Sequence, residues 1–353
     1  MFSNINSLSE KLDLSENMLF TKPTDIKYLV GTGTDGGVEV LVRNKKIYIL
    51  SNPLYLKELE SKFGNFDVIN TDDAKLMKKV FGKIQSLIVD GTSITLNQQK
   101  KFEEFGVKNL DISKRGMLTD LRKIKSKDEL EVLKESQKIN VEVLKTVIKN
   151  ITLGITEFDI AQMIKVEHLK LGASGESFEP IVAFGKSASE PHHINSKIKK
   201  LKKGDSILFD LGCIYEGYCS DMTRVVFTTK NKAKELELYL LLKNIHDECI
   251  KFGKIGTRYK DFHYKAVELL GKYAKNFIHN LGHGIGLDIH EFPIGMKNLD
   301  DKIEENEVFS VEPGVYFHGK YGFRYENVVV ATKKGLVDIL GDIENDIDLF
   351  VEL

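Results

Sequence analysis

Histidines and glycines crowd into residues 279–293 in a pattern that could support chemistry. His279, His283 and His290 fall within twelve residues of a 353-residue chain that has only nine histidines. Glycines on both sides of His283 allow a ligand or a metal ion to approach the backbone closely. His279 and His283 have the spacing of a helical zinc pair, but the nearby glycines disfavour a helix and no HExxH motif is present. We therefore expect His283 to act with residues from elsewhere in the chain.

Four carboxylates stand in apolar or glycine-rich sequence contexts: Asp210, Asp221, Glu312 and Glu326. Carboxylates gathered in apolar surroundings repel one another and resist the loss of water, and divalent cations between them remove that cost. Together with His283 they would form a mostly oxygen ligand set, which suits manganese first, with cobalt, iron or zinc as alternatives. The sequence therefore predicts a site for two divalent metal ions, although glutamates at such positions are more usually exposed edge residues.

Asp210 and Asp221 are predicted to share a β-hairpin, because a turn-forming Tyr-Glu-Gly segment, 215–217, lies between them. A loop made of its first two residues would place the two aspartates directly opposite each other on one face. A bulge at its glycine would shift the register by one residue, and a second bulge, which Gly212 could supply, would then be needed. The sequence leaves both arrangements open, as well as a solvent-facing Asp210 on a half-exposed strand.

Such a site would perform hydrolysis. Two cations about 3.5–4 Å apart can hold a bridging hydroxide, lower its pKa and polarise a substrate carbonyl. Cleavage of an amide also requires a proton for the leaving nitrogen. Glu312 and His290 are the nearest candidate donors by motif.

The elements that must position these residues fall into two parts. Residues 1 to about 121 alternate apolar strand-like runs with helical stretches, which predicts a smaller α/β unit. Its expected strands are 28–30, 38–42, 47–50 and 87–89, and its expected helices are 54–63 and 71–81. The glycine-rich segment 32–37 is predicted as a hairpin turn, because it lacks the GK[ST] ending of a phosphate loop.

From Ser126 onward, helices interleave with antiparallel strands, which predicts an α+β second domain. Ser126-Lys127-Asp128-Glu129 is a capping box that opens a helix reaching about residue 149. Further helices are expected at 156–172, 233–252 and 259–273. Strands are expected at 181–184, 206–213, 218–228, 308–311 and 327–331.

Composition argues against several classes of function. Lys and Arg number 51 against 52 Asp and Glu, so neither nucleic acid nor an anionic membrane is expected as a partner. No apolar run of about 18 residues predicts a transmembrane helix, and the first residues lack the pattern of a secretory signal. Cys213, Cys219 and Cys249 form no CxxC pair, so reduced thiols and a cytoplasmic location are expected.

Five motifs together resemble those of the pita-bread metallopeptidases, which include methionine aminopeptidases, Xaa-Pro aminopeptidases and prolidases. The motifs are LFDLG (208–212), GYCSDMTR (217–224), LGHGIGLDIHEFP (281–293), FSVEPGVY (309–316) and FRYENVVV (323–330). The resemblance begins near residue 126, and 120–126 resembles the join to a creatinase-like amino-terminal domain shared by prolidases and Xaa-Pro aminopeptidases. It implies an α+β chain with a smaller α/β creatinase-like domain over 1–121 and a pita-bread catalytic domain over 122–353.

The resemblance also implies how the ligands divide between two metal ions. Asp210 would bind one ion, and Asp221 and Glu326 would bridge both. His283 and Glu312 would complete the second ion's ligands. Glu312 would in addition shuttle the proton of the attacking water.

Substrate contacts are implied in the same way. His290 would contact the substrate and stabilise the tetrahedral intermediate, and His192 would reach the substrate from an upstream loop. His279 would line the proline pocket, with a hydrogen-bonded core histidine as the alternative. Arg324 would contact the prolyl end or support the metals, whereas His193 has no counterpart and is expected to be structural or exposed.

All five implied ligands are present, so an active enzyme is expected. Asn327 follows the bridging glutamate where the family often has an acidic residue, which is expected to alter metal affinity without removing a ligand. The leading interpretation is a prolidase, an Xaa-Pro dipeptidase taking small peptides with proline second. An Xaa-Pro aminopeptidase for longer peptides is the main alternative. A metal-free creatinase-like amidinohydrolase and a non-catalytic pita-bread binding protein fit the retained ligands less well. Relatives are often homodimers, and a homodimer with capped active sites is the expected assembly.

Overall fold

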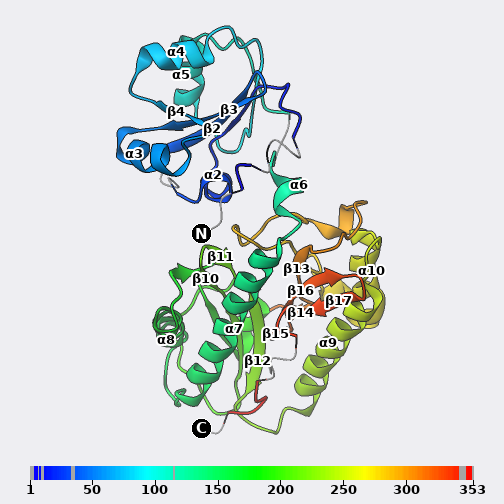
Figure 1. Ribbon diagram of the computed structural model, residues 1–353. Helices are drawn as coiled ribbons and strands as arrows, with labels where there is room; N and C mark the ends of the chain where they lie inside the picture. Colours follow the sequence, from blue (N-terminus) through cyan, green and yellow to red (C-terminus); the bar gives the residue numbers. More distant parts are fainter. Residues whose placement is uncertain are drawn as a thin grey trace. The chain divides into compact units, whose positions relative to one another are not determined.

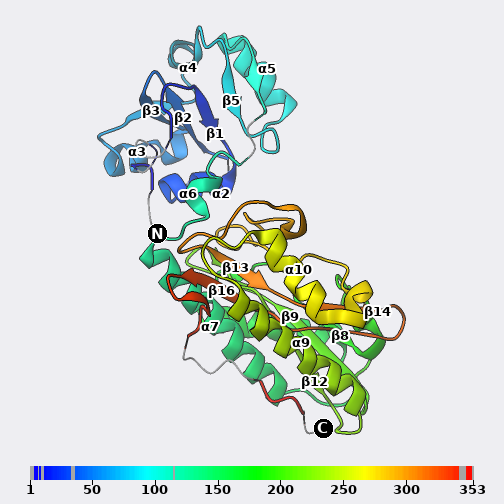
Figure 2. The same ribbon diagram turned by 90° about the vertical axis from the view of Figure 1, so that its right-hand side faces the viewer.

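The computed structural model describes residues 4–6, 8, 12–32, 36–113, 116–341 and 347–351. The chain divides into two compact units, Met1–Arg122 and Lys123–Leu353 (Figures 1 and 2). Within the described ranges, no helix combines the length and the apolar content needed to span a membrane. Each unit has its own sheet system, and the residues singled out for chemistry all belong to the second unit.

The first unit is built on one mixed six-stranded sheet in the order β4-β3-β2-β1-β5-β6. Its strands are β1 (Met18–Phe20), β2 (Val38–Arg43), β3 (Lys46–Ser51), β4 (Asp67–Asn70), β5 (Leu87–Val89) and β6 (Leu110–Asp111). Its helices are α2 (Pro23–Val30), α3 (Pro53–Lys62), α4 (Ala74–Phe81), α5 (Leu96–Phe105) and α6 (Thr119–Arg122). Phe81 and Phe102 stack between α4 and α5 with their ring centroids 5.3 Å apart, within the apolar core of this unit.

The predicted strand at 28–30 is wrong, because these residues end helix α2. Pro23 begins this helix, and Gly31 ends it in the left-handed conformation with φ 80°. The prediction missed three strands of this sheet, β4, β6 and β1, and β1 pairs with β2 and β5 at the centre of the sheet. The errors at 28–30 and at β1 have one cause: a run of three apolar residues is too short to show a helical or a strand period.

The segment 32–37 is not the predicted hairpin turn, since it joins helix α2 to strand β2. Its residues 33–35 lie outside the described residues. The other strands predicted in this unit are present as β2, β3 and β5, and the helices predicted at 54–63 and 71–81 are present as α3 and α4.

The second unit places antiparallel strands between two pairs of helices (Figure 1). The helices are α7 (Lys127–Lys149), α8 (Glu157–Lys170), α9 (Ala233–Phe252) and α10 (Tyr259–Leu270). The three-stranded sheets are β12-β9-β8, β11-β10-β7 and β13-β16-β17, and β14 pairs with β15. Capping boxes at Ser126 and Thr156 begin α7 and α8, and in both the hydroxyl accepts the N–H three residues on. This is the α+β architecture that the sequence predicts.

The strand bounds show where the second unit departs from regular pairing. They are β7 (Gly175–Glu176), β8 (Ile181–Phe184), β9 (Ser206–Leu211), β10 (Cys213–Tyr215), β11 (Tyr218–Cys219), β12 (Met222–Phe227), β13 (Val308–Val311), β14 (Gly314–Phe317), β15 (Tyr321–Arg324), β16 (Asn327–Thr332) and β17 (Gly335–Asp338). The strands predicted at 206–213 and 218–228 are thus each interrupted, between β9 and β10 and between β11 and β12. The helix predicted over 259–273 stops at residue 270 and continues as a 3₁₀ turn.

The register of the interrupted hairpin differs from both arrangements that the sequence left open. The two-residue loop is Glu216-Gly217, with φ 47° and 89°. Positive φ at both loop positions favours glycine and disfavours a bulky residue such as Tyr215, which the sequence had suggested as the first loop residue. Tyr215 pairs with Tyr218 before the break and Leu211 with Met222 after it, so both strands contribute the same number of residues between these pairs. No bulge is therefore inserted.

Asp210 consequently lies opposite Thr223, and Asp221 lies diagonally across, two residues before Thr223. Residues two apart on a strand share a face, and diagonal partners remain within reach of side chains. Asp210 is 6% exposed and every residue of β9 and β12 is buried, so the solvent-facing alternative for Asp210 is wrong.

Gly212 marks the break, and we predict that Gly212→Ala destabilises the fold. A Cβ at Gly212 would lie 2.0 Å from the backbone oxygen of Ser220, so the two strands would have to separate. We expect a loss of unfolding free energy of about 1–3 kcal/mol or more, measured by urea denaturation. Gly175→Ala is the matched control, because a Cβ at Gly175 meets no atom within 4 Å. Equal stability of the two variants would contradict the prediction.

Candidate metal centre and active site

One cavity of about 380 Å³ in the second unit is lined by every residue that the sequence singled out for chemistry. The proposed ligands among them are Asp210, Asp221, His283, Glu312 and Glu326, and the proposed substrate contacts are His192, His279, His290 and Arg324. Apolar side chains also line it: Phe178, Ile181, Pro191, Ile289 and Ile294. The fold therefore brings a polar cluster and an apolar wall into the same space.

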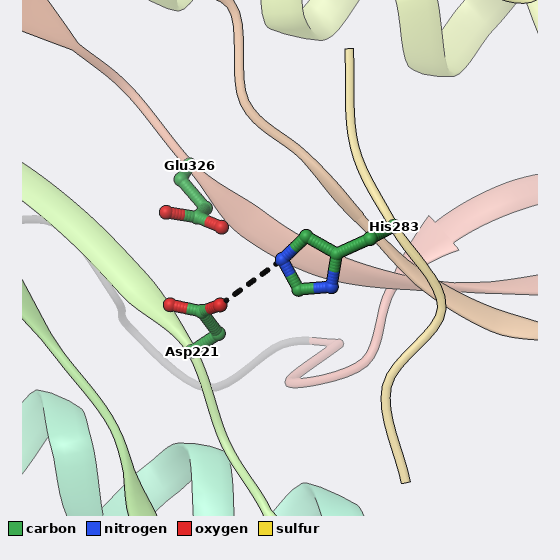
Figure 3. A group of neighbouring side chains, drawn as sticks. All are labelled: Asp221, His283 and Glu326. Atoms are coloured by element: carbon green, nitrogen blue, oxygen red, sulfur yellow. Dashed lines mark ion pairs between the residues drawn. The ribbon is translucent and has the colours of Figure 1, made fainter. Parts of the chain in front are cut away.

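Asp221, His283 and Glu326 form a close group of potential metal ligands (Figure 3). Each offers one ligand atom, and these atoms all lie within 4.8 Å of one another. Figure 3 shows the three side chains converging from separate segments of the chain, with His283 Nε2 3.3 Å from Asp221 Oδ2. His283 Nε2 is also 3.5 Å from Glu312 Oε1, which adds a fourth ligand candidate to the group.

Burial makes this cluster electrostatically costly. It raises the pKa of Asp221 well above its usual value, and the neighbouring Glu326 and Asp210 carboxylates raise that pKa further. Burial and the charge of Glu326 raise the pKa of Glu312 in the same way. Burial, followed by the charge of Asp210, also raises the pKa of Glu326. Carboxylates that resist ionisation alone would ionise readily around divalent cations, so the donor set fits metal ions.

Arg324 lines the cavity and contacts the carboxylates of Asp210 and Glu326. Its Nη2 donates to Asp210 Oδ2, its Nε donates to Thr223 Oγ1 at 2.7 Å, and its Nη1 donates to the Tyr316 hydroxyl at 2.7 Å. Of the two roles suggested for Arg324, contact with the prolyl end or support of the ligands, these contacts match the second.

Thr223 was not predicted as a site residue. Its hydroxyl lies 3.2 Å from Asp210 Oδ1 and 2.5 Å from Glu326 Oε2, so it links two carboxylates. The strand period could have revealed it, because Thr223 lies two residues beyond Asp221 on the same face. Tyr316 was also missed. It follows Glu312 by four residues across a turn, where no local period relates the two side chains.

The loop that carries His283 is fixed against strand β13. Ser310 N–H donates to the His283 carbonyl at 2.8 Å, and His283 N–H donates to Ser310 Oγ at 3.0 Å. A Cβ at Gly282 would lie 1.9 Å from the Ser310 carbonyl oxygen, so only glycine allows this approach. The same Ser310 hydroxyl donates to Glu312 Oε1 at 3.1 Å, which ties two ligand candidates to one residue.

His279 and His290 line the cavity as neutral side chains. Burial lowers the pKa of His279 to about 3, and Arg324 lowers it further; its Nδ1 donates to the Asn280 carbonyl at 2.7 Å. His279 lines the cavity and is hydrogen-bonded, and its place in a proline pocket stays a prediction. Burial lowers the pKa of His290 to about 4, and its ring lies edge-on to His283 with centroids 4.3 Å apart.

Of the remaining residues discussed from the sequence, His192 lines the cavity, whereas His193 and Asn327 are not among its lining residues. His193 contacts the buried Glu157 with Nε2 2.8 Å from Oε2. Asn327 accepts a hydrogen bond from Arg224 at 2.6 Å, and Arg224 also donates to the Glu326 carbonyl at 2.6 Å. Asn327 is therefore linked through Arg224 to the backbone carbonyl of Glu326, one of the proposed ligands.

The loop that carries His290 is anchored by a buried ion pair, for which we predict a large stability effect. Lys125 Nζ lies 2.7 Å from Glu291 Oε1, and the two residues are 2% and 8% exposed. Lys125→Met removes the ammonium group from a buried carboxylate, and we expect a loss of about 3–5 kcal/mol of unfolding free energy. The double variant Lys125→Met/Glu291→Gln should recover most of this loss in urea denaturation. Strictly additive losses would contradict the coupling.

A second prediction concerns pH. Burial lowers the pKa of His263 from 6.5 to about 4, and the neutral ring accepts the Leu281 N–H at 3.2 Å. Because the unfolded chain takes up this proton first, the contribution of His263 to stability is present above about pH 6.5 and is lost as pH falls toward 4. His263→Asn keeps an acceptor but does not titrate. The unfolding free energy of the parent minus that of this variant should therefore fall between pH 7.5 and 5, and a constant difference would refute the assignment.

Comparison with known proteins places this geometry in a family. Metallopeptidase family M24 matches residues 131–333. The Xaa-Pro dipeptidase of Pyrococcus furiosus is 29% identical over 331 residues, which cover 91% of this chain and 92% of that protein. The solved structure of an Xaa-Pro dipeptidase from Bacillus anthracis superposes with a TM-score of 0.89 at 26% identity, covering 99% of both chains. An X-Pro aminopeptidase from Thermotoga maritima superposes with a TM-score of 0.84 at 27% identity, covering 96% of this chain and 99% of that one.

The expected pita-bread architecture is confirmed by these superpositions, and the family match covers more than half of the chain. The chain belongs to metallopeptidase family M24 and is a peptidase of the pita-bread fold.

Proposed function

We propose that this chain hydrolyses the Xaa-Pro bond of dipeptides and releases the amino-terminal residue, using two divalent metal ions. The observation that carries the proposal is the convergence of four carboxylates and one imidazole on a single cavity with an apolar wall. Similarity to Xaa-Pro dipeptidases over nearly the whole chain supports the substrate class.

The metal ions would be held by the five proposed ligands: Asp210, Asp221, His283, Glu312 and Glu326. When bound, such ions activate water and polarise the substrate carbonyl. The family resemblance suggests that Asp221 and Glu326 would be shared by both ions, and their ligand atoms group with that of His283 within 4.8 Å. Manganese is the proposed metal, since oxygen donors predominate in the set.

Glu312 is the proposed proton carrier. Burial and the charge of Glu326 raise its pKa, which suits a carboxyl group that takes a proton from the attacking water and passes it to the leaving nitrogen. Its Oε1 accepts a hydrogen bond from the Ser310 hydroxyl, and its Oε2 lies 3.6 Å from His279 Nδ1. The neutral His290 is proposed to donate a hydrogen bond to the substrate carbonyl as it gains negative charge, and His192, on the same cavity, is proposed to do so too.

Recognition of proline would rely on shape rather than on a backbone donor. The nitrogen of an Xaa-Pro bond carries no hydrogen, and the ring is rigid. The apolar wall, which includes Phe178, Ile181 and Ile294, and the neutral His279 offer such a ring a surface without charge. We propose that the prolyl ring lies against this wall.

An Xaa-Pro aminopeptidase acting on longer peptides is the second candidate, and one observation favours it. A dipeptide carries its carboxylate next to the proline ring, where a cation would bind it. Among the described residues that line the cavity, Arg324 is the sole Lys or Arg, and three of its five N–H groups donate to Asp210, Thr223 and Tyr316. Longer peptides place their carboxylate elsewhere and do not need that cation.

The assembly and location inferred from the sequence stay predictions. Cys213, Cys219 and Cys249 are all free and buried, which supports a reducing compartment such as the cytoplasm. A homodimer is proposed from the family resemblance alone.

The proposal is tested with protein stripped by a chelator and reloaded with Mn²⁺. We expect cleavage of Ala-Pro only after reloading, and at least a 100-fold loss of kcat/KM for Asp221→Asn, because that residue would serve both ions. Asp300→Asn is the matched control, since Asp300 is exposed and pairs with Lys260 at the surface. The alanine and proline formed are measured by chromatography.

Ala-Pro-Ala distinguishes the two candidates in the same assay. Preference for Ala-Pro-Ala would establish the aminopeptidase, and cleavage that survives chelation would indicate a metal-free hydrolase. No cleavage of either peptide by reloaded protein would overturn the proposed substrate class.

A further inference from the structure

Asp221 lies in a gap between two strands. Strand β11 ends at Cys219 and β12 begins at Met222, so neither ladder of the hairpin includes Asp221. Asp221 is nevertheless only 5% exposed. A buried backbone N–H or C=O without a partner is costly, so this gap requires hydrogen-bond partners from outside the hairpin.

Gln137 of helix α7 supplies both partners. Its Nε2 donates to the Asp221 carbonyl at 2.7 Å, and its Oε1 accepts the Asp221 N–H at 3.1 Å. Gln137 is 2% exposed. A side-chain amide combines donor and acceptor as a peptide group does. The Gln137 amide therefore takes the place that a neighbouring strand would occupy beside Asp221.

Two other buried side chains of α7 bind the same broken hairpin. Ser136 Oγ donates to the Cys213 carbonyl at 3.2 Å, and Asn140 Nδ2 donates to the Leu211 carbonyl at 3.3 Å. His168 of α8 holds Asn140 in turn, with Nε2 3.1 Å from Oδ1. These contacts support the hairpin on either side of the gap, whereas Gln137 bonds to the ligand candidate itself.

We infer that Gln137 is a positioning residue for the metal centre: by clamping both backbone groups of Asp221, it aims the Asp221 carboxylate at His283 and Glu326. This inference rests on the proposed metal site. The direction is the one drawn in Figure 3, where the Asp221 carboxylate faces His283. Loss of the clamp would let Asp221 shift while the chain around it stays folded.

The test is isothermal titration of Mn²⁺ into metal-free protein, with urea denaturation of the same samples. Gln137→Met keeps the length of the side chain and removes both hydrogen bonds. We expect its affinity for Mn²⁺ to fall by about 10–100-fold, the range for partners that orient metal ligands. Ser136→Ala is the matched control: it removes a buried hydrogen bond to the same hairpin but leaves Asp221 clamped, and its affinity should stay within about twofold of the parent.

A second variant guards against misfolding. Gln137→Glu keeps the acceptor for the Asp221 N–H and loses the donor to its carbonyl, and we expect a weaker affinity for Mn²⁺ here too. Parent-like affinity in the folded Gln137 variants would overturn the inference. Equal loss in Ser136→Ala and Gln137→Met would also overturn it, since that marks a general effect of stability. Absence of Mn²⁺ binding by the parent protein would instead overturn the proposed metal site itself.

Discussion

Four carboxylates enclosed in one cavity repel one another, and this repulsion governs how the second unit is built. Arg324 offsets part of the charge through its contact with Asp210. Burial and the mutual repulsion of the others raise the pKa values of Asp221, Glu312 and Glu326. Divalent cations held by the four proposed carboxylate ligands would complete the compensation, because a cation favours the ionised form of a carboxylate. The same groups would then hold the ions that activate water.

Keeping these groups in place requires backbone geometry that a continuous sheet does not provide. Strand pairing is interrupted beside Gly212, where a side chain would collide with the facing backbone. The broken pairing is offset by the amide of Gln137, which bonds to both backbone groups of Asp221. Gly282 similarly lets the His283 loop pack on Ser310. Helix α7 is therefore part of the site's support as well as of the fold.

Local sequence signals predicted much of the second unit. Ser126 begins α7 because its capping box needs only residues within one turn, and 181–184 and 308–311 form the strands expected from their apolar runs. The interruption of the strands beside Gly212 was not predicted, and the hydrogen bonds to Asp221 in the gap come from Gln137, which lies far from it in the sequence. Residues 28–30 were misassigned as a strand, because three apolar residues are too few to show the period of the helix that they end.

Residue types and motif spacing were enough to identify five candidate ligands, the family and a hydrolytic chemistry, because these depend on which side chains are present. The folded chain decided how they are arranged. It placed Asp221 diagonally from Asp210, turned Arg324 toward the carboxylates and paired Lys125 with Glu291. Those outcomes depend on contacts between residues far apart in sequence, which local propensities do not specify. Many side chains of suitable charge and size could pair with each of these residues, and the packing of the whole fold selects one.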